Sequence, residues 1–216
     1  MRAILSHNAG LESSELSFRV GVKREMAGTE TNDLSTQRAY WNQYNQTREH
    51  ARTRVSNDQE RVVLRWFEAL GQRQFQIIDV GCGAGWLCEK LLPYGNVVGT
   101  DLSDEALRRT AARVPAVTFI AGNFLDLDFG KDLFDVVVTL ETLSHIEDQE
   151  AFIAKAAMLL KPGGHLMLAT QNRPALEKND VPPPSPGQLR HWVDRDELRA
   201  LLQPAFEVKE LFSGKA

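Results

Sequence analysis

The sequence predicts an α/β fold with helices on both faces of a doubly wound, mostly parallel sheet. Five short runs rich in β-branched and large apolar residues recur along the chain, at residues 76–80, 97–101, 117–121, 134–140 and 165–170. Such apolar runs are typical of parallel strands that are buried on both faces. The stretches between them are about 10 to 20 residues long and several carry helical periodicity, as parallel crossovers require.

Local signals define the elements that flank and join these strands. Apolar and aromatic side chains at three- and four-residue steps predict two helices over residues 36–70, which form an N-terminal helical cap. Ser103 and Asp148 each precede a helical pattern and can accept hydrogen bonds from its first turn. Asp194 and Glu197 have the spacing of a capping box, which predicts the start of a later helix.

The rest of the chain is less regular. Lys-Pro-Gly-Gly at residues 161–164 predicts a turn, and the proline-rich segment 171–190 predicts a stiff loop. Residues 206–212 predict a sixth and last strand. Residues 1–35 show no sustained periodicity, so we expect a mobile leader or arm ahead of a single domain over residues 36–216.

Composition limits the classes of partner. The 216 residues include 25 basic and 29 acidic side chains, so the formal net charge is −4, which disfavours nucleic acid and anionic membranes as partners. No apolar run approaches the roughly 18 residues that a membrane span needs, and the first residues lack the apolar segment of a signal peptide. Two cysteines, Cys82 and Cys88, are too few for a disulfide framework, so we expect a cytoplasmic location.

A glycine-rich turn is the strongest functional signal. The strand that ends at Val80 runs into glycines at alternate positions, Gly81, Gly83 and Gly85, and then into a predicted helix. Glycine allows a tight turn and close approach of a ligand to the backbone, and the start of a helix offers unpaired N–H groups to an anion. The turn therefore predicts a site for a nucleoside cofactor.

A carboxylate at the end of the next strand supports this prediction. Asp101 follows Asp79 by 22 residues and can accept hydrogen bonds from both hydroxyls of a ribose. Nicotinamide dinucleotide sites use the same spacing, so a nicotinamide-dependent reductase remains an alternative. Trp86, however, stands where a G-x-G-x-x-G fingerprint has its third glycine.

The segment Asp-Val-Gly-Cys-Gly-Ala-Gly at residues 79–85 resembles the first motif of the class I S-adenosylmethionine-dependent methyltransferases. Four further segments resemble later motifs of that family in the same order: Asp101, then residues 122–124, 134–138 and 161–164. The resemblance covers roughly residues 75–171. It implies S-adenosylmethionine as cofactor and S-adenosylhomocysteine as product.

The resemblance also implies which residues bind the cofactor. It places Asp79 near the amino group, the three glycines along the methionine and ribose, and Asp101 at the ribose hydroxyls. Asn123 stands in place of the usual aspartate near adenine. The full set of implied cofactor residues is Asp79, Gly81, Cys82, Gly83, Gly85, Asp101, Leu102, Asn123, Phe124 and Leu140, with Tyr40 and Trp41 on an aromatic helix that covers the cofactor.

Candidate catalytic residues follow the fourth of the five strands. His145 titrates near neutral pH and is the first candidate for a general base, with Glu141 as an alternative base or an orienting partner. This segment resembles the Glu-x-x-Glu-His arrangement of the ubiquinone-biosynthesis O-methyltransferases, which can hold a divalent metal. Ser144 replaces the middle ligand here, so we expect no metal.

The acceptor pocket is expected outside the common core. Tyr44 lies on the aromatic helix, and Arg190, His191 and Trp192 follow the proline-rich loop. Aromatic walls with an arginine suit a flat or anionic acceptor. We therefore predict methyl transfer to an oxygen or nitrogen of a small metabolite.

Two alternatives remain besides the reductase. Arginines at positions 38, 48, 52, 54 and 61 leave open RNA or protein as the methyl acceptor. A non-catalytic domain that binds cofactor and acts as a regulatory or assembly partner is the second. It is motivated by the strand count, because the sequence shows six strands where the resemblance implies seven, and a truncated sheet or a strand exchanged in a homodimer would explain the difference.

Overall fold

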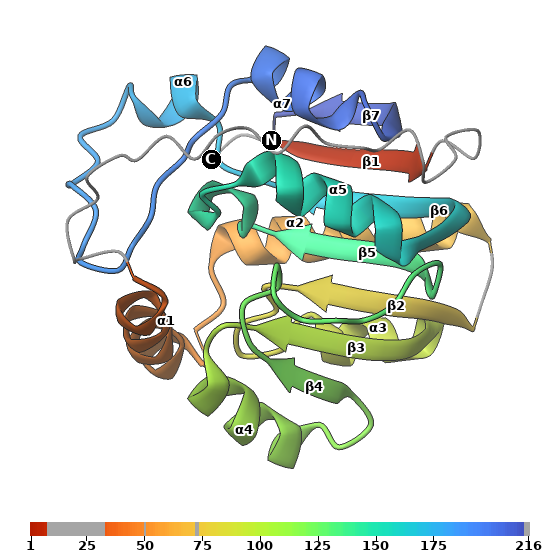
Figure 1. Ribbon diagram of the computed structural model, residues 1–216, viewed down its shortest axis with the longest axis horizontal. Coiled ribbons are helices and arrows are strands. Elements are labelled where there is room, and N and C mark those ends of the chain that lie inside the picture. Colours follow the sequence, from red (N-terminus) through yellow and green to blue (C-terminus); the bar gives the residue numbers. More distant parts are fainter. Residues whose placement is uncertain (8–32, 50, 72–73, 214–216) are drawn as a thin grey trace.

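The computed structural model describes residues 1–7, 33–49, 51–71 and 74–213. These residues form a seven-stranded sheet in the order β4-β3-β2-β5-β6-β1-β7, with helices on both faces (Figure 1). The predicted doubly wound α/β fold is confirmed. The strands are β1 (Arg2–His7), β2 (Phe75–Val80), β3 (Gly95–Asp101), β4 (Thr118–Ala121), β5 (Phe134–Leu140), β6 (Leu160–Ala169) and β7 (Phe206–Phe212).

The order of the strands creates a switch point beside β2. The chain moves outward from β2 through β3 to β4 and then returns to pair β5 with the other side of β2. All of these pairs are parallel, and Val80 aligns with Thr100, so β2 and β3 end at one edge of the sheet. Ligands of open α/β sheets bind at such an edge, next to the switch point.

Strand β1 differs from the prediction for the N-terminal segment. Residues 2–7 are not part of a mobile arm but form a strand between β6 and β7, antiparallel to both. The side chains of Ala3 and Leu5 are fully buried there. This strand is the seventh strand that the sequence analysis lacked, so neither truncation nor strand exchange is needed to complete the sheet. The remainder of the predicted arm, residues 8–32, lies outside the described residues.

Two helices precede β2, as predicted for the N-terminal cap. They are α1 (Leu34–Arg48) and α2 (Arg54–Leu70), and the apolar face of α2 buries Val63, Trp66 and Phe67 against one side of the sheet. The opposite side is covered by α5 (Gln149–Leu159) and α7 (Arg195–Leu202). The other helices are α3 (Cys88–Leu91), α4 (Asp104–Arg113) and α6 (Arg173–Leu176), with short 3-10 turns at Leu92–Tyr94 and Leu143–His145.

The predicted helix caps have different outcomes. Asp148 accepts a hydrogen bond from the Ala151 N–H, and Asp194 forms the predicted capping box with Glu197. Ser103 occupies the N-cap position of α4, but its hydroxyl oxygen accepts no hydrogen bond from the first turn of the helix. It accepts one of 2.7 Å from the Asn45 side-chain amide and donates its own proton to Asp101.

Two local predictions around the core are wrong. Residues 161–164 lie inside β6 and do not form a turn ahead of the strand, although Gly163 takes a positive φ of 77° and the pairing with β5 shifts register there, so they form an irregularity within the strand. The glycine turn does not lead directly into a long helix either. Helix α3 begins only at Cys88 and has four residues. Helix α3 is therefore too short for its N-terminus to act as the anion site that the sequence predicted.

Candidate functional site

A cavity of about 670 Å³ opens at the carboxyl edge of the sheet. Its walls come from the glycine turn after β2, the ends of β3 and β5, the segment after β6, and the helices α1 and α2. A volume of this size is within the range of small-molecule sites in proteins. It therefore has room for a nucleoside cofactor together with a small second ligand.

The first two glycines of the turn are required by close contacts. Gly81 has a φ of 75°, and a Cβ atom there would lie 1.9 Å from the Thr142 hydroxyl oxygen. Gly83 has a φ of 55°, and its Cβ would lie 3.0 Å from the Asn45 side-chain oxygen. Both residues line the cavity. Positive φ angles and this crowding together explain why glycine occupies these positions.

The third glycine has a different role. Gly85 is absent from the cavity lining, and a Cβ there would lie 2.6 Å from a methyl group of Thr110 on α4. Its close contacts are therefore with the helix and strand beneath the turn. The structure does not bring Gly85 to the surface where the resemblance implied a cofactor contact.

Asp101 is fixed at the end of β3. One of its carboxylate oxygens accepts a hydrogen bond of 2.8 Å from the Gly83 N–H, and the other accepts one of 2.8 Å from the Ser103 N–H. Asp101 and the adjacent Leu102 both line the cavity. The turn and the acid thus hold each other in place. The Ser103 hydroxyl also donates to Asp101, so about one of the four lone-pair sites of the carboxylate is left for a ligand hydroxyl.

Asp79 lies beneath the cavity in an apolar setting. It is only 3% exposed, and the Cys88 thiol donates to its carboxylate at 3.3 Å. Burial raises the pKa of Asp79 to about 7. Cys82 also lines the cavity, but its contact with the Cys88 thiol and its burial raise the pKa of Cys82. A thiol in this state is a weak nucleophile.

The residues expected near adenine lie at the cavity, but Asn123 is already engaged. Its side-chain NH2 donates to Asp126 at 2.9 Å, and its oxygen accepts from the Leu125 N–H at 3.3 Å. Phe124 is buried, and both it and Leu140 line the cavity. Asn123 therefore stabilises its own turn in addition to facing the site.

His145 lies in the 3-10 turn after β5 and lines the cavity. Its Nδ1 is 2.7 Å from the carbonyl oxygen of Leu189. A carbonyl can only accept, so Nδ1 carries the proton and Nε2 of the neutral ring keeps its lone pair. Burial lowers the pKa of His145, so the ring is neutral at physiological pH.

Glu141 directly follows β5 and has a positive φ of 60°, which is uncommon for a residue with a Cβ atom. Its carboxylate accepts a hydrogen bond of 2.6 Å from the side-chain amide of Gln59 on α2. Burial raises the pKa of Glu141. Strained backbone of this kind is common at functional sites, because the surrounding structure has to hold it in place.

The aromatic helix contributes two of its three predicted residues. Trp41 packs edge-on against His145 with ring centroids 4.7 Å apart, and Trp41 and Tyr44 line the cavity. Tyr40 does not. Its Cβ lies against Gly187 in the proline-rich loop, at 3.0 Å from the position of an added Cβ. Tyr40 therefore joins α1 to that loop.

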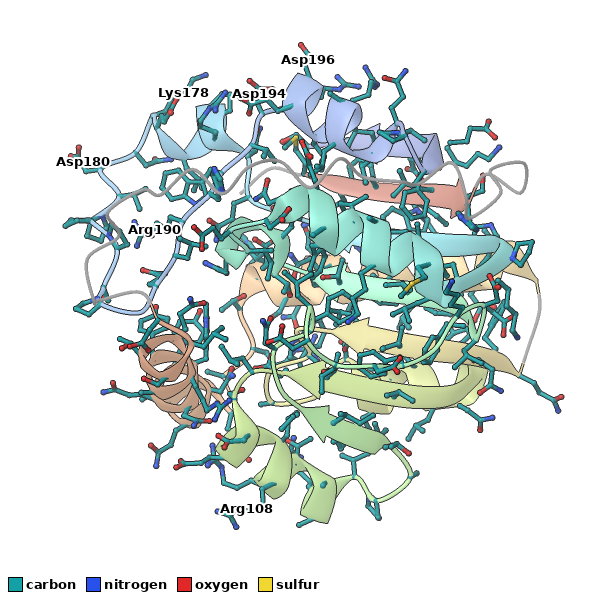
Figure 2. All side chains as sticks on the ribbon, in the orientation of Figure 1. Arg108, Lys178, Asp180, Arg190, Asp194 and Asp196 are labelled. Atoms are coloured by element: carbon teal, nitrogen blue, oxygen red, sulfur yellow. The ribbon has the colours of Figure 1, made fainter. Side chains whose placement is uncertain are left out.

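The residues after the proline-rich loop do not line the cavity. Arg190 donates to the Pro182 carbonyl and to Gln188, and Figure 2 shows it on the segment that leads toward α7. Trp192 lies 5.5 Å from the Arg190 guanidinium, and His191 is exposed. The prediction that Arg190, His191 and Trp192 face the acceptor is not supported by this placement.

Other cavity residues were missed by the sequence analysis. Arg2 comes from β1, Gln59 from α2, and Arg52 from the α1–α2 connection, where its guanidinium lies 4.7 Å from the Trp86 ring centroid. Two threonine hydroxyls that belong to cavity residues, those of Thr100 and Thr170, are buried and have no hydrogen-bond partner within the described residues. Only tertiary pairing brings these side chains to the site. No sequence signal identified them.

The described residues contain neither a cluster of potential metal ligands nor a candidate membrane-spanning helix. Within the described ranges, no three His, Cys, Asp or Glu side chains gather closely enough to hold a metal ion. None of the helices described is both long and apolar enough to cross a bilayer.

The comparisons with known proteins agree with this geometry. Residues 78–168 match the family described as "Methyltransferase domain". A ubiquinone biosynthesis O-methyltransferase from Mesorhizobium japonicum is 36% identical over 103 residues, which are 45% of this chain and 41% of that protein. Another from Pectobacterium carotovorum is 32% identical over 151 residues, which are 57% of this chain and 62% of that protein. The chain thus spans about two fifths to three fifths of the length of these relatives.

A solved structure shows the same fold. The N-methyltransferase NodS from Bradyrhizobium japonicum, solved with S-adenosylhomocysteine, has a TM-score of 0.60 and 20% identity, and the match covers 76% of this chain and 85% of that one. The residues at the present site fit this cofactor, because Gly81 and Gly83 open the backbone to a ligand and Asp101 lies at the rim. The family match over residues 78–168, the strand order and the glycine turn all support a class I S-adenosylmethionine-dependent methyltransferase.

Proposed function

We propose that this protein transfers a methyl group from S-adenosylmethionine to an oxygen atom of a small metabolite, with nitrogen as the second choice of accepting atom. The cofactor supplies an electrophilic methyl group on a sulfonium. The relatives named as ubiquinone biosynthesis O-methyltransferases support oxygen. The chain's own contribution is to hold the acceptor in line, exclude water and, for a hydroxyl, remove its proton.

The observation that carries the proposal is the setting of His145. The Leu189 carbonyl fixes the proton on Nδ1 and leaves Nε2 able to accept a proton from an acceptor hydroxyl. The ring lies in the same cavity as the glycine turn and Asp101. Trp41 packs edge-on against this ring, with centroids 4.7 Å apart. A neutral, oriented imidazole beside a cofactor site is the arrangement that general-base catalysis needs.

The cofactor end of the cavity is expected to use the glycine turn and Asp101. Backbone at Gly81 and Gly83 would lie against the methionine and ribose portions, and the Asp101 carboxylate would accept from a ribose hydroxyl. Arg52 lies on the same wall, with its guanidinium 4.7 Å from the Trp86 ring centroid, and it is paired with Glu60. A guanidinium has five N–H donors, so those not used by Glu60 suit the carboxylate of the cofactor's amino acid end.

The experiment separates binding from transfer. Isothermal titration should show micromolar binding of S-adenosylmethionine to wild type and to His145→Gln. Incubation with deuteromethyl-labelled cofactor and a metabolite extract, followed by mass spectrometry, should show labelled small molecules. His145→Gln should lower their formation about 100-fold, whereas the matched variant His191→Gln, in an exposed histidine outside the cavity, should not. Methyl transfer by His145→Gln at the wild-type rate would refute the role of this base. Lack of cofactor binding by the wild type would refute the function.

Two observations weaken the alternatives. Arg52 and Arg61 are paired with Glu60 and Asp58, so these two arginines do not form an open basic face for RNA. The non-catalytic alternative was motivated by a missing strand, and β1 supplies that strand. Label found only in small molecules, and not in RNA or protein separated by size, would support the small-metabolite function directly.

A further inference from the structure

Strand β1 brings a buried arginine to the side of the cavity away from the glycine turn. Arg2 pairs with Ala169 of β6 and Phe212 of β7, so it lies at the carboxyl edge of β6. The residue is only 9% exposed and lines the cavity. Glu141 also lines the cavity and interacts electrostatically with Arg2, and Gln59 donates to the Glu141 carboxylate. Arg2 thus belongs to the part of the cavity left for the second ligand.

The guanidinium of Arg2 has few partners for a buried cation. Its ion-pair partner among the described residues is Asp58, at 3.6 Å, which is longer than a hydrogen bond. Asp58 makes its closer contact, 2.7 Å, with Arg61. The other neighbour of Arg2 is the Phe212 ring, at 6.0 Å from its centroid. Within the described part of the chain, the guanidinium makes no hydrogen bond, so its donors are open to a ligand.

Two other charged groups lie on this wall, the Met1 ammonium group and the Glu141 carboxylate, and each interacts electrostatically with the other and with Arg2. Glu141 accepts the 2.6 Å hydrogen bond from Gln59, and its burial disfavours the ionised form. Apolar residues of the two cap helices line the same cavity: Leu34 and Trp41 of α1 and Val55 of α2. Leu34 and Val55 are exposed large apolar side chains at 45% and 43%. The wall therefore combines an open cation with surfaces for an apolar body.

We infer that the methyl acceptor is an organic anion whose carboxylate is bound by Arg2 while its apolar body packs against Trp41 and Val55. A planar carboxylate can accept two parallel hydrogen bonds from a guanidinium, which fixes orientation as well as position. This inference rests on the proposed function, since it assigns the second ligand of that site. Arg2 takes the role that the sequence analysis gave to Arg190.

The test uses benzoate and its uncharged analogue benzamide as probes, titrated into the protein saturated with S-adenosylhomocysteine. Benzoate should bind wild type about tenfold or more tightly than benzamide, because a charge-assisted bidentate pair is lost with the amide. Arg2→Gln should abolish that preference, and Arg2→Lys should keep part of it. Arg65→Gln is the matched control, because Arg65 also lies 6.0 Å from the Phe212 ring but pairs with Glu210 and does not line the cavity. It should keep the full preference.

A second variant covers the case in which Arg2→Gln does not fold. Asp58→Asn removes the competing carboxylate and leaves β1 intact, so it should strengthen benzoate binding about two- to fivefold without changing benzamide binding. Equal binding of the two probes to wild type, no saturable benzoate binding, or an unchanged preference in folded Arg2→Gln would each overturn the inference. No methyl transfer is involved in these titrations, so their failure is distinguishable from failure of the proposed function.

Discussion

Replacement of Asp79 by asparagine should stabilise the cofactor-free protein much more at pH 8 than at pH 5. The carboxyl group of Asp79 is buried, and burial raises its pKa from an ordinary value of 3.8 to about 7. Between these two values the folded state holds a proton that the unfolded state releases. The free energy of unfolding of the wild type therefore falls as the pH rises through this window. Asparagine has a similar shape and binds no proton, so the variant lacks this loss.

The magnitude follows from the two pKa values. At pH 5 the folded wild type is almost fully protonated at Asp79, and at pH 8 it is almost fully ionised, while the unfolded chain is ionised at both. The linkage relation gives a loss of about 2.5 kcal/mol of wild-type stability between pH 5 and pH 8 from this group alone. Any change in the hydrogen bond from Cys88 affects the variant equally at both pH values. The stabilisation by Asp79→Asn should therefore be larger at pH 8 by about that amount.

The assay is equilibrium urea denaturation, monitored by tryptophan fluorescence without cofactor at both pH values. Asp180→Asn, in the exposed proline-rich loop, controls for the loss of a carboxylate as such. A difference between Asp79→Asn and wild type that is the same at pH 5 and pH 8, or is larger at pH 5, would refute the reasoning. The titration of His145 and of other groups is present in both proteins and cancels.

Three further predictions test the turn, the acid and the N-terminal strand. Asp101→Ala should weaken S-adenosylmethionine binding at least about tenfold in isothermal titration, because the ribose loses a charged acceptor; unchanged affinity would exclude this role. Gly81→Ala should lower the free energy of unfolding by about 1–3 kcal/mol, because its Cβ would overlap the Thr142 hydroxyl, and Thr142→Ala should restore part of the loss in a double-mutant cycle. Leu5→Ala should cost about 2–5 kcal/mol in urea denaturation, because Leu5 is fully buried; an effect below about 0.5 kcal/mol would mean that residues 2–7 are a mobile arm after all.

Features with a local physical cause could be predicted from the sequence. The strands from β2 to β5 are short apolar runs, and hydrophobic burial on both faces makes such runs parallel strands whatever their neighbours are. The capping box at Asp194 needs only residues three positions apart. The glycine turn and Asp101 are joined by one strand–helix–strand unit, so their spacing alone places the acid beside the turn. These local rules gave the fold class and the cofactor end of the site.

Features that depend on pairing between distant segments could not be predicted. Arg2–His7 is too short to show a period, and it becomes a strand because β6 and β7 offer edges on both of its sides. Gly85 continues the alternating glycine pattern of Gly81 and Gly83, but it packs against Thr110 of α4 and does not line the cavity. In a sequence, Arg2 and Arg190 look equally suitable as cations that bind the acceptor. Only the folded chain distinguishes them, because it buries Arg2 in the cavity wall and leaves Arg190 bound to its own loop. The sequence by itself thus determined the chemistry available to this protein, and tertiary contacts, whose energies depend on which surfaces meet, decided which side chains share the cavity.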